Sequence, residues 1–179
     1  LLMKALMVVT DGFEEIEAIG TLALLRRAKI DVTFASLYGD KATGRYGVTS
    51  SHMVPLQTLD PLSFDCLIIP GGPEYIAEEN DPNFLEMVRR CHSKGMIIGA
   101  ICAGPTILGH LGLLKGKRYT CFTSMDEDFG GTYVDEYAVR DGNLITGRSA
   151  AASIDFAFLL IEALASKEIA DQVKASIYY

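Results

Sequence analysis

The chain has 179 residues, of which 49% are hydrophobic and 22% are charged, with a formal net charge of −7. This size and balance predict one globular domain over residues 1–179 with a core of ordinary size. The acidic charge and the scattering of the 16 Lys and Arg residues exclude a nucleic-acid partner, which needs clustered cations. No apolar run approaches the roughly 20 residues of a membrane helix, and no signal-type segment opens the chain, so we expect no membrane association and a cytoplasmic location.

Apolar runs typical of buried strands alternate with helical patterns along the chain. In chain order we expect a strand at 3–9, a helix at 13–27, strands at 32–35 and 66–69, a helix at 84–94, a strand at 96–98, a helix at 104–111, a short strand near 119–121, a hairpin from 132–139 and 144–146, and helices at 152–164 and 167–173. The Gly-, Ser- and Thr-rich segment 38–54 predicts a hairpin or an irregular excursion. The pattern predicts an α/β fold with a parallel sheet covered on both faces.

Cys102 lies between an apolar run and a predicted helix, with small residues on both sides. This arrangement is typical of a nucleophile elbow, in which a tight turn after a strand presents a reactive side chain. The N–H groups at the start of the next helix favour a thiolate. The alternative is a buried, inert thiol.

The other cysteines lack such surroundings. Cys66 falls in an apolar run and Cys121 in a short strand pattern, whereas Cys91 lies in a polar helix and is expected to be exposed or half-exposed. No Cys or His pair has the spacing of metal ligands, so we expect no metal and four reduced thiols.

The loops after three predicted strands should converge at the carboxyl edge of the sheet. They contain Glu14, Glu15 and Glu17, the pair Gly71-Gly72, and Cys102. Acidic residues are favourable at the start of a helix, and this alone would explain at least two of the glutamates. Glu17 precedes an apolar turn and is expected to point inward, where a protonated carboxyl group would donate to the thiolate.

These three segments resemble the signature segments of the ThiJ/PfpI superfamily, in particular its DJ-one (Parkinson-associated protein) branch. They read Gly-Phe-Glu-Glu-Ile-Glu at 12–17, Ile-Pro-Gly-Gly at 69–72 and Ala-Ile-Cys-Ala-Gly-Pro-Thr at 100–106. The resemblance extends over about 3–175. It implies a flavodoxin-like three-layer sandwich with a mostly parallel central sheet, and a homodimer.

By this resemblance, Cys102 is the oxidisable cysteine and Glu17 is the protonated glutamate that contacts its sulfur. The backbone N–H groups of Gly71, Gly72 and Ala103 would line the pocket and stabilise an oxyanion or a sulfinate. Arg45 resembles an arginine that approaches the pocket, often across the dimer interface, and is equally well explained as a solvated loop cation.

The chain departs from the family pattern after the helix that follows Cys102. Relatives commonly carry a histidine where this chain has Phe122, so a Cys–His pair is missing. His110 resembles a structural histidine of the branch and not a base. Peptidase-like members have a histidine directly after the nucleophile, where this chain has Ala103, and proteolysis is therefore not expected.

The resemblance implies an enzyme that needs no cofactor and acts on small reactive carbonyls. Cys102 would add to a 2-oxoaldehyde such as methylglyoxal, Glu17 would move the proton, and water would release lactate, as in glyoxalase III; protein deglycation would share the addition step. The alternative is a redox sensor or chaperone of oxidative stress, in which peroxide converts Cys102 to a sulfinate.

Overall fold

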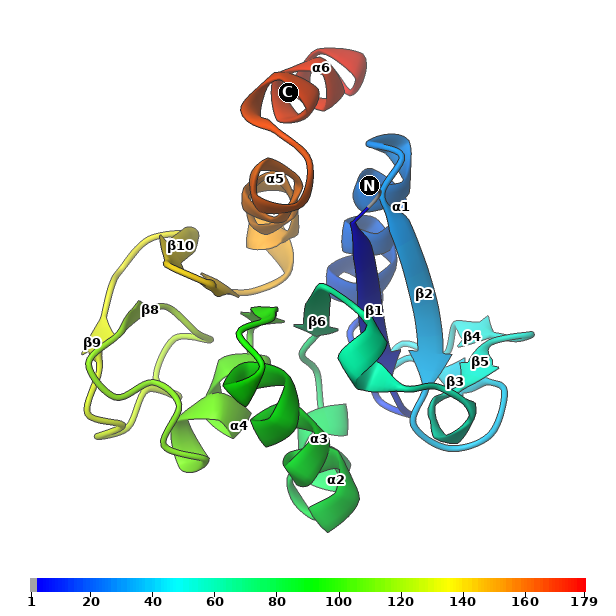
Figure 1. The fold of residues 1–179 in the computed structure, drawn as a ribbon, viewed down its shortest axis with the longest axis vertical. Coiled ribbons are helices and arrows are strands. Elements are labelled where there is room, and N and C mark those ends of the chain that lie inside the picture. The colour runs from blue at the N-terminus through cyan, green and yellow to red at the C-terminus, as the bar shows by residue number, and fades with distance from the viewer. Residues whose placement is uncertain (1–2) are drawn as a thin grey trace.

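The computed structural model describes residues 3–179, so the first two residues of the expected domain lie outside the described residues. A seven-stranded sheet forms its centre, and every neighbouring pair of strands is parallel except β10 and β11 (Figure 1). The strands in spatial order are β10 (Ala138–Asp141), β11 (Leu144–Gly147), β7 (Ile97–Ile101), β6 (Cys66–Ile69), β1 (Lys4–Val9), β2 (Asp31–Ser36) and β5 (Val54–Pro55).

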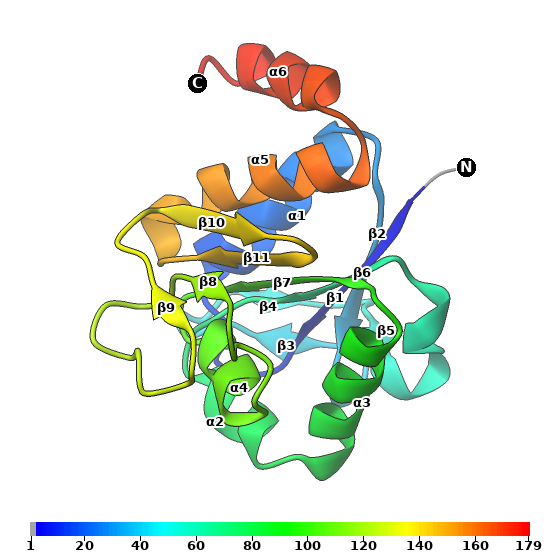
Figure 2. The same ribbon diagram turned by 60° about the vertical axis from the view of Figure 1, so that its left-hand side comes forward.

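Helices cover both faces of the sheet, which makes three layers (Figure 2). One face carries α1 (Thr21–Arg27), α5 (Ser153–Leu164) and α6 (Lys167–Ser176), and the other carries α2 (Glu74–Glu79), α3 (Pro82–Ser93) and α4 (Gly104–His110). The expected flavodoxin-like α/β sandwich is confirmed.

Burial on both faces explains the apolar strands. In β1, the side chains of Met7 and Val9 join the core beneath α1 and α5, while Leu6 and Val8 join the core beneath α3 and α4. Since neighbouring strand residues point to opposite faces, a strand covered twice must be apolar throughout.

Two short pairs of strands lie outside the main sheet. The segment 38–54 contains the antiparallel pair β3 (Ala42–Thr43) and β4 (Thr49–Ser50), so the hairpin expected there is confirmed. β8 (Arg118–Tyr119) pairs with β9 (Thr132–Tyr133). From residue 3 to residue 179, no helix has the length and apolar character needed to cross a membrane.

Two expectations about the elements are wrong, and the sequence pattern misses one helix. The helix expected at 13–27 begins as a π-helical turn, η1 (Ile16–Gly20), before α1. The strand expected at 132–139 is divided into β9 and β10, because β9 pairs with β8 instead of the main sheet. The six-residue helix α2 was not predicted at all.

The burial of Cys91 also corrects the sequence-based expectation. Its side chain is fully buried, because it shares the inner face of α3 with Phe84, Met87 and Val88. The helix is fixed at its start by Asp81, whose carboxylate accepts from the N–H groups of Asn83 and Phe84. All four cysteines are free and buried.

We expect Gly109→Ala to lower the free energy of unfolding by about 1–3 kcal/mol, although alanine normally favours a helix. A Cβ atom at Gly109 would lie 2.5 Å from ring atoms of Phe129, which is itself buried. The matched control is Gly20→Ala, where the nearest atom is 4.0 Å away and we expect stabilisation of about 0.5 kcal/mol. Urea titration of both variants checks this, and equal stability of the two would contradict it.

Candidate active site

Cys102 lies in the turn between β7 and α4, at the carboxyl edge of the sheet. Its φ is 64°, a left-handed conformation that is strained for a residue with a side chain. The N–H of Cys102 donates to the carbonyl oxygen of Gly147 at 2.9 Å, which ties the turn to β11. The strand, strained turn and helix form the expected nucleophile elbow, and 9% of the cysteine remains exposed.

Glu17 lies in the π-helical turn η1 and is 1% exposed. Its Oε1 accepts a hydrogen bond from the N–H of Gly71 at 3.0 Å, and its Oε2 has no hydrogen-bond partner within residues 3–179. The turn is held by Glu14, whose carboxylate accepts from the N–H groups of Ile16 and Glu17. The side chain of Glu17 therefore points inward, toward the loop after β6.

Gly71 separates the acid from the thiol. A Cβ atom at this position would lie 2.6 Å from both Cys102 Cβ and Glu17 Oε1. At Gly72, where φ is 94°, a Cβ atom would lie 2.5 Å from the carbonyl oxygen of Gly12. Glu17 and Cys102 therefore both approach the backbone of Gly71, and they can do so only because this residue has no Cβ atom.

Burial shifts the proton equilibria of both groups. Desolvation, followed by the charge of Glu14, raises the pKa of Glu17 to about 7. Desolvation and the charge of Glu17 raise the pKa of Cys102 to about 12. The N–H at the start of the next helix lowers the pKa of Cys102, as expected, but burial and the neighbouring carboxylate outweigh it.

Two donors act in the opposite direction on the sulfur. The N–H of Ala103 and the hydroxyl of Ser149 both lower the pKa of Cys102, and Ser149 Oγ lies 3.8 Å from Sγ. The N–H of Gly71 is not free to line the pocket as expected, because Glu17 accepts it. In the described part of the chain, the N–H of Gly72 makes no hydrogen bond.

The β3–β4 hairpin packs beside the π-helical turn. Glu15 accepts from the N–H groups of Tyr46 and Val48, so this glutamate fixes the hairpin and does more than complement the helix dipole. In the loop of the same hairpin, the N–H of Arg45 donates to the carbonyl oxygen of Phe13 at 2.8 Å, and the charge of Arg45 acts on Glu17. Its guanidinium lies 5.0 Å from the ring centre of the exposed Tyr46.

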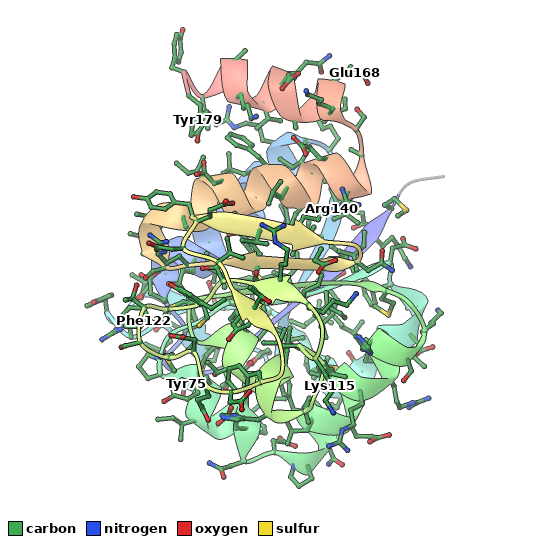
Figure 3. The ribbon with its side chains drawn as sticks, turned by 90° about the vertical axis from the view of Figure 1, so that its left-hand side faces the viewer. Tyr75, Lys115, Phe122, Arg140, Glu168 and Tyr179 are labelled. Carbon is green, nitrogen blue, oxygen red and sulfur yellow. The ribbon has the colours of Figure 1, made fainter. Side chains whose placement is uncertain are left out.

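Phe122 is adjacent to Cys102 through the backbone: its N–H donates to the carbonyl oxygen of Cys102 at 2.9 Å. Its ring is 43% exposed and lies at the surface (Figure 3). His110 lies elsewhere, with its ring nitrogens 2.6 Å from Glu79 and 2.8 Å from Glu127. Neither residue supplies a base to the sulfur.

Sequence reasoning missed two buried glutamates of α2. Glu74 Oε1 accepts from the N–H of Thr10 at 2.8 Å, while Glu74 Oε2 and both oxygens of Glu78 have no hydrogen-bond partner in the described chain. Desolvation raises the pKa of each carboxyl group well above its ordinary value. These side chains could have been noticed only by predicting α2.

No group of three His, Cys, Asp or Glu side chains within residues 3–179 is arranged to hold a metal.

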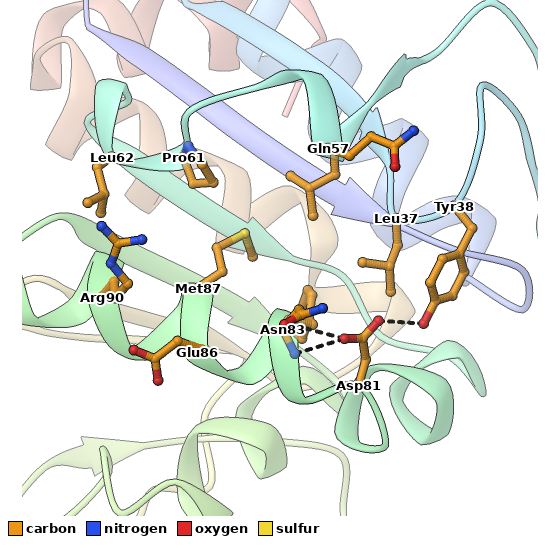
Figure 4. A pocket seen from close by; sticks show the side chains of 12 residues that line it. Leu37, Tyr38, Gln57, Pro61, Leu62, Asp81, Asn83, Glu86, Met87 and Arg90 are labelled. Carbon is orange, nitrogen blue, oxygen red and sulfur yellow. Dashed lines mark hydrogen bonds between the residues drawn. The ribbon is translucent and has the colours of Figure 1, made fainter.

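A groove of about 450 Å³ lies apart from these residues, between α3 and the turns that follow β5 (Figure 4). Its apolar lining includes Leu37, Leu62 and Met87, and at one end the hydroxyl of Tyr38 donates to Asp81 at 2.6 Å. None of the predicted site residues lines it.

Comparisons with known proteins show which sequences and folds this chain resembles. Protein dj-1beta of Drosophila melanogaster is 34% identical over 177 residues, covering 95% of this chain and 94% of that protein. A deglycase of Thermococcus kodakarensis is 32% identical, covering 82% of this chain and 90% of that protein. The crystal structure of Drosophila DJ-1beta has a TM-score of 0.92 at 33% identity and covers 99% of this chain and 98% of that chain.

A structure of oxidized Toxoplasma gondii DJ-1 has the same TM-score, 0.92, at 28% identity, and covers 99% of this chain and 98% of that chain. The model of the DJ-1/PfpI family matches residues 3–163. The resemblance found in the three loop segments is thereby confirmed, and this chain belongs to the DJ-1/PfpI family.

Proposed function

We propose that this protein converts reactive 2-oxoaldehydes, such as methylglyoxal to lactate, with Cys102 as nucleophile and Glu17 as proton carrier, and that it removes the same groups from glycated proteins. The observation that carries this proposal is the contact region around Gly71, where a strained cysteine faces a carboxyl group whose pKa burial raises to about 7. The deglycase names of several relatives support it.

The chemistry needs one acid and no cofactor. The thiolate adds to the aldehyde carbon, and the carboxyl proton of Glu17 neutralises the alkoxide to give a hemithioacetal. The Glu17 carboxylate then removes the hydrogen of that carbon and returns a proton to the neighbouring carbonyl carbon, while the hydroxyl proton of the hemithioacetal moves to the former carbonyl oxygen, which leaves a thioester of lactate. Water hydrolyses the thioester and restores the thiol.

The proton count of the site fits this sequence. Below about pH 7 the pair of Glu17 and Cys102 holds two protons, and above it the pair holds one. Because the pKa of Cys102 is higher than that of Glu17, the single proton rests mainly on the sulfur, and the active form is the minor one in which this proton lies on the glutamate and the sulfur is a thiolate. Deglycation begins with the same form. The sulfur bonds to the carbon that was the aldehyde carbon of the glycating compound, the bond from that carbon to the amine breaks, and the amine leaves with the proton of Glu17.

A second candidate function is redox sensing that alters partner binding or chaperone behaviour, and it rests on the donors around the sulfur. The N–H of Ala103, the hydroxyl of Ser149 and a protonated Glu17 surround Sγ, and all three can donate to sulfinate oxygens. The oxidized state of the similar Toxoplasma protein favours testing this candidate.

We also propose a homodimer that buries the surface beside the site. Ile16 is 58% exposed, Tyr46 72% and Val48 51%, and Glu15 links the two segments that carry them. Exposed apolar side chains gathered in this way are typical of protein interfaces. A partner on this surface would cover Arg45 and the entrance to Glu17.

We expect Cys102→Ser and Glu17→Gln each to lower methylglyoxal turnover by about a hundredfold or more, because one removes the nucleophile and the other the proton carrier. Steady-state lactate formation measures this. Glu86→Gln, on the exposed face of α3, is the matched control and should keep wild-type turnover. Wild-type turnover by either site variant would refute the mechanism.

The stability of the protein should report the proton on Glu17. The folded chain keeps this proton up to about pH 7, whereas an ordinary carboxyl group loses it near 4.5. The folded state therefore binds more protons, and this group makes the free energy of unfolding fall as the pH rises between these values. In Glu17→Gln, the fall between pH 5 and pH 8 should be smaller by about 2 kcal/mol.

Urea titrations at the two pH values measure this difference, with Glu86→Gln again as control. An identical pH dependence in wild type and Glu17→Gln would mean that Glu17 is not protonated in the folded state, and the proton-carrier role would fail with it.

Peroxide titration tests the redox candidate. If Cys102 is a sensor, graded peroxide should add two oxygen atoms to this residue before Cys66, Cys91 or Cys121 changes, because the donors around Sγ hold the sulfinate. Intact and peptide mass measurements locate the oxygens. Simultaneous oxidation of several thiols would argue against sensing.

A further inference from the structure

Ser149 approaches the sulfur of Cys102 from the segment after β11, which the sequence pattern does not single out. β11 pairs with β7 in parallel, with Gly147 opposite Ile101, and the N–H of Cys102 donates to the carbonyl oxygen of Gly147. This register places Ser149, two residues further on, beside the elbow. Its Oγ lies 3.8 Å from Sγ of Cys102.

The hydroxyl group of Ser149 has no other use in the described chain. The residue precedes the short turn Ala150–Ala152, where a serine side chain ordinarily accepts a backbone N–H. Here the side chain makes no such bond, and the N–H of Ala152 donates to the backbone carbonyl oxygen of Ser149 instead. The hydroxyl is therefore free to form a hydrogen bond with the sulfur of Cys102.

The backbone around Ser149 is held on both sides. Arg148 donates its N–H to the carbonyl oxygen of Tyr137 at 2.9 Å and forms an ion pair with Asp135. The guanidinium also lies 5.6 Å from the ring centre of Tyr137. With the bond from Ala152 on the other side, these contacts limit the freedom of the serine to turn away from Cys102.

We propose that Ser149 is a positioning residue, whose hydroxyl donates a hydrogen bond to the Cys102 thiolate and thereby increases the reactivity of the sulfur. The inference rests on the nucleophilic Cys102 of the proposed function, and deepens it. A hydroxyl donates strongly to a thiolate and only weakly interacts with a thiol, so it favours the charged form. It is a neutral donor, and it adds no charge to a site that already contains Glu17.

The charged groups around the sulfur do not replace this hydrogen bond. From η1, the charge of Glu17 disfavours a thiolate at Cys102, while Glu14, which precedes η1, and Arg45 of the hairpin act on Glu17. From α4, the N–H of Ala103 is the other donor. Loss of the hydroxyl leaves the N–H of Ala103 and the protonated form of Glu17 as the donors that oppose the desolvation of the thiolate, so the thiolate fraction at neutral pH should fall.

The rate of alkylation of Cys102 by iodoacetamide from pH 6 to pH 12, a range that reaches the raised pKa of the thiol, followed by peptide mass measurement, tests the inference. We expect Ser149→Ala to react about tenfold more slowly at pH 7, with its rate profile shifted to higher pH. Ser149→Thr keeps the hydroxyl and should recover most of the wild-type rate. Ser63→Ala, which removes an exposed hydroxyl far along the chain, should match wild type.

Wild-type rates for Ser149→Ala at every pH would overturn the inference. A slower rate with an unshifted profile would overturn it too, because that result indicates altered access and not a lost hydrogen bond. Methylglyoxal turnover by the wild type, measured in parallel, separates the two proposals: a shifted profile without turnover refutes only the carbonyl chemistry, and turnover with an unshifted profile refutes only the role of Ser149.

Discussion

The close approach of the Gly71 backbone to Glu17 and Cys102 is the constraint on which the site depends. Its N–H binds the carboxyl group, and its missing side chain leaves room for the thiol. Since β6 lies between β1 and β7, the loops that carry the glycine, the acid and the cysteine leave the sheet side by side. Any side chain at this position would push the acid and the sulfur apart.

The site costs stability, and the sheet offsets the cost. Cys102 is held with positive φ, and Glu17, Glu74 and Glu78 are buried with raised pKa values. Strain and buried polar groups of this kind persist only where the surrounding structure fixes them. Here β7 is hydrogen-bonded on both sides and covered by helices on both faces, so the elbow is attached to the most constrained part of the fold.

The sequence predicts those features that depend on local pattern. Buried runs such as 66–69 and the small residues around Cys102 indicate the sheet and the elbow, because strand burial and turn geometry act on neighbouring residues. It does not predict Ser149, which reaches the sulfur through strand register across 47 positions of sequence. Nor does it predict α2, a short helix begun by Pro73 without a side-chain cap and stabilised by tertiary contacts. The sequence also gives the wrong exposure for Cys91. Its neighbours along the chain are polar, although the side chain itself lies on the buried face of α3.

Phe122, at the position where relatives commonly carry a histidine, affects which reactions the site can catalyse. Without an imidazole next to the sulfur, the groups that act directly on Sγ are a carboxyl, a backbone N–H and a hydroxyl. Only the carboxyl group titrates near neutral pH, so this one group must both donate the proton that neutralises the alkoxide and carry the second proton between the carbons. A site of this kind suits small carbonyl compounds, in which the two carbons that exchange the proton are adjacent. It suits peptide bonds poorly. Their cleavage needs a group that donates a proton to the departing amine and a base that activates water to hydrolyse the remaining acyl group.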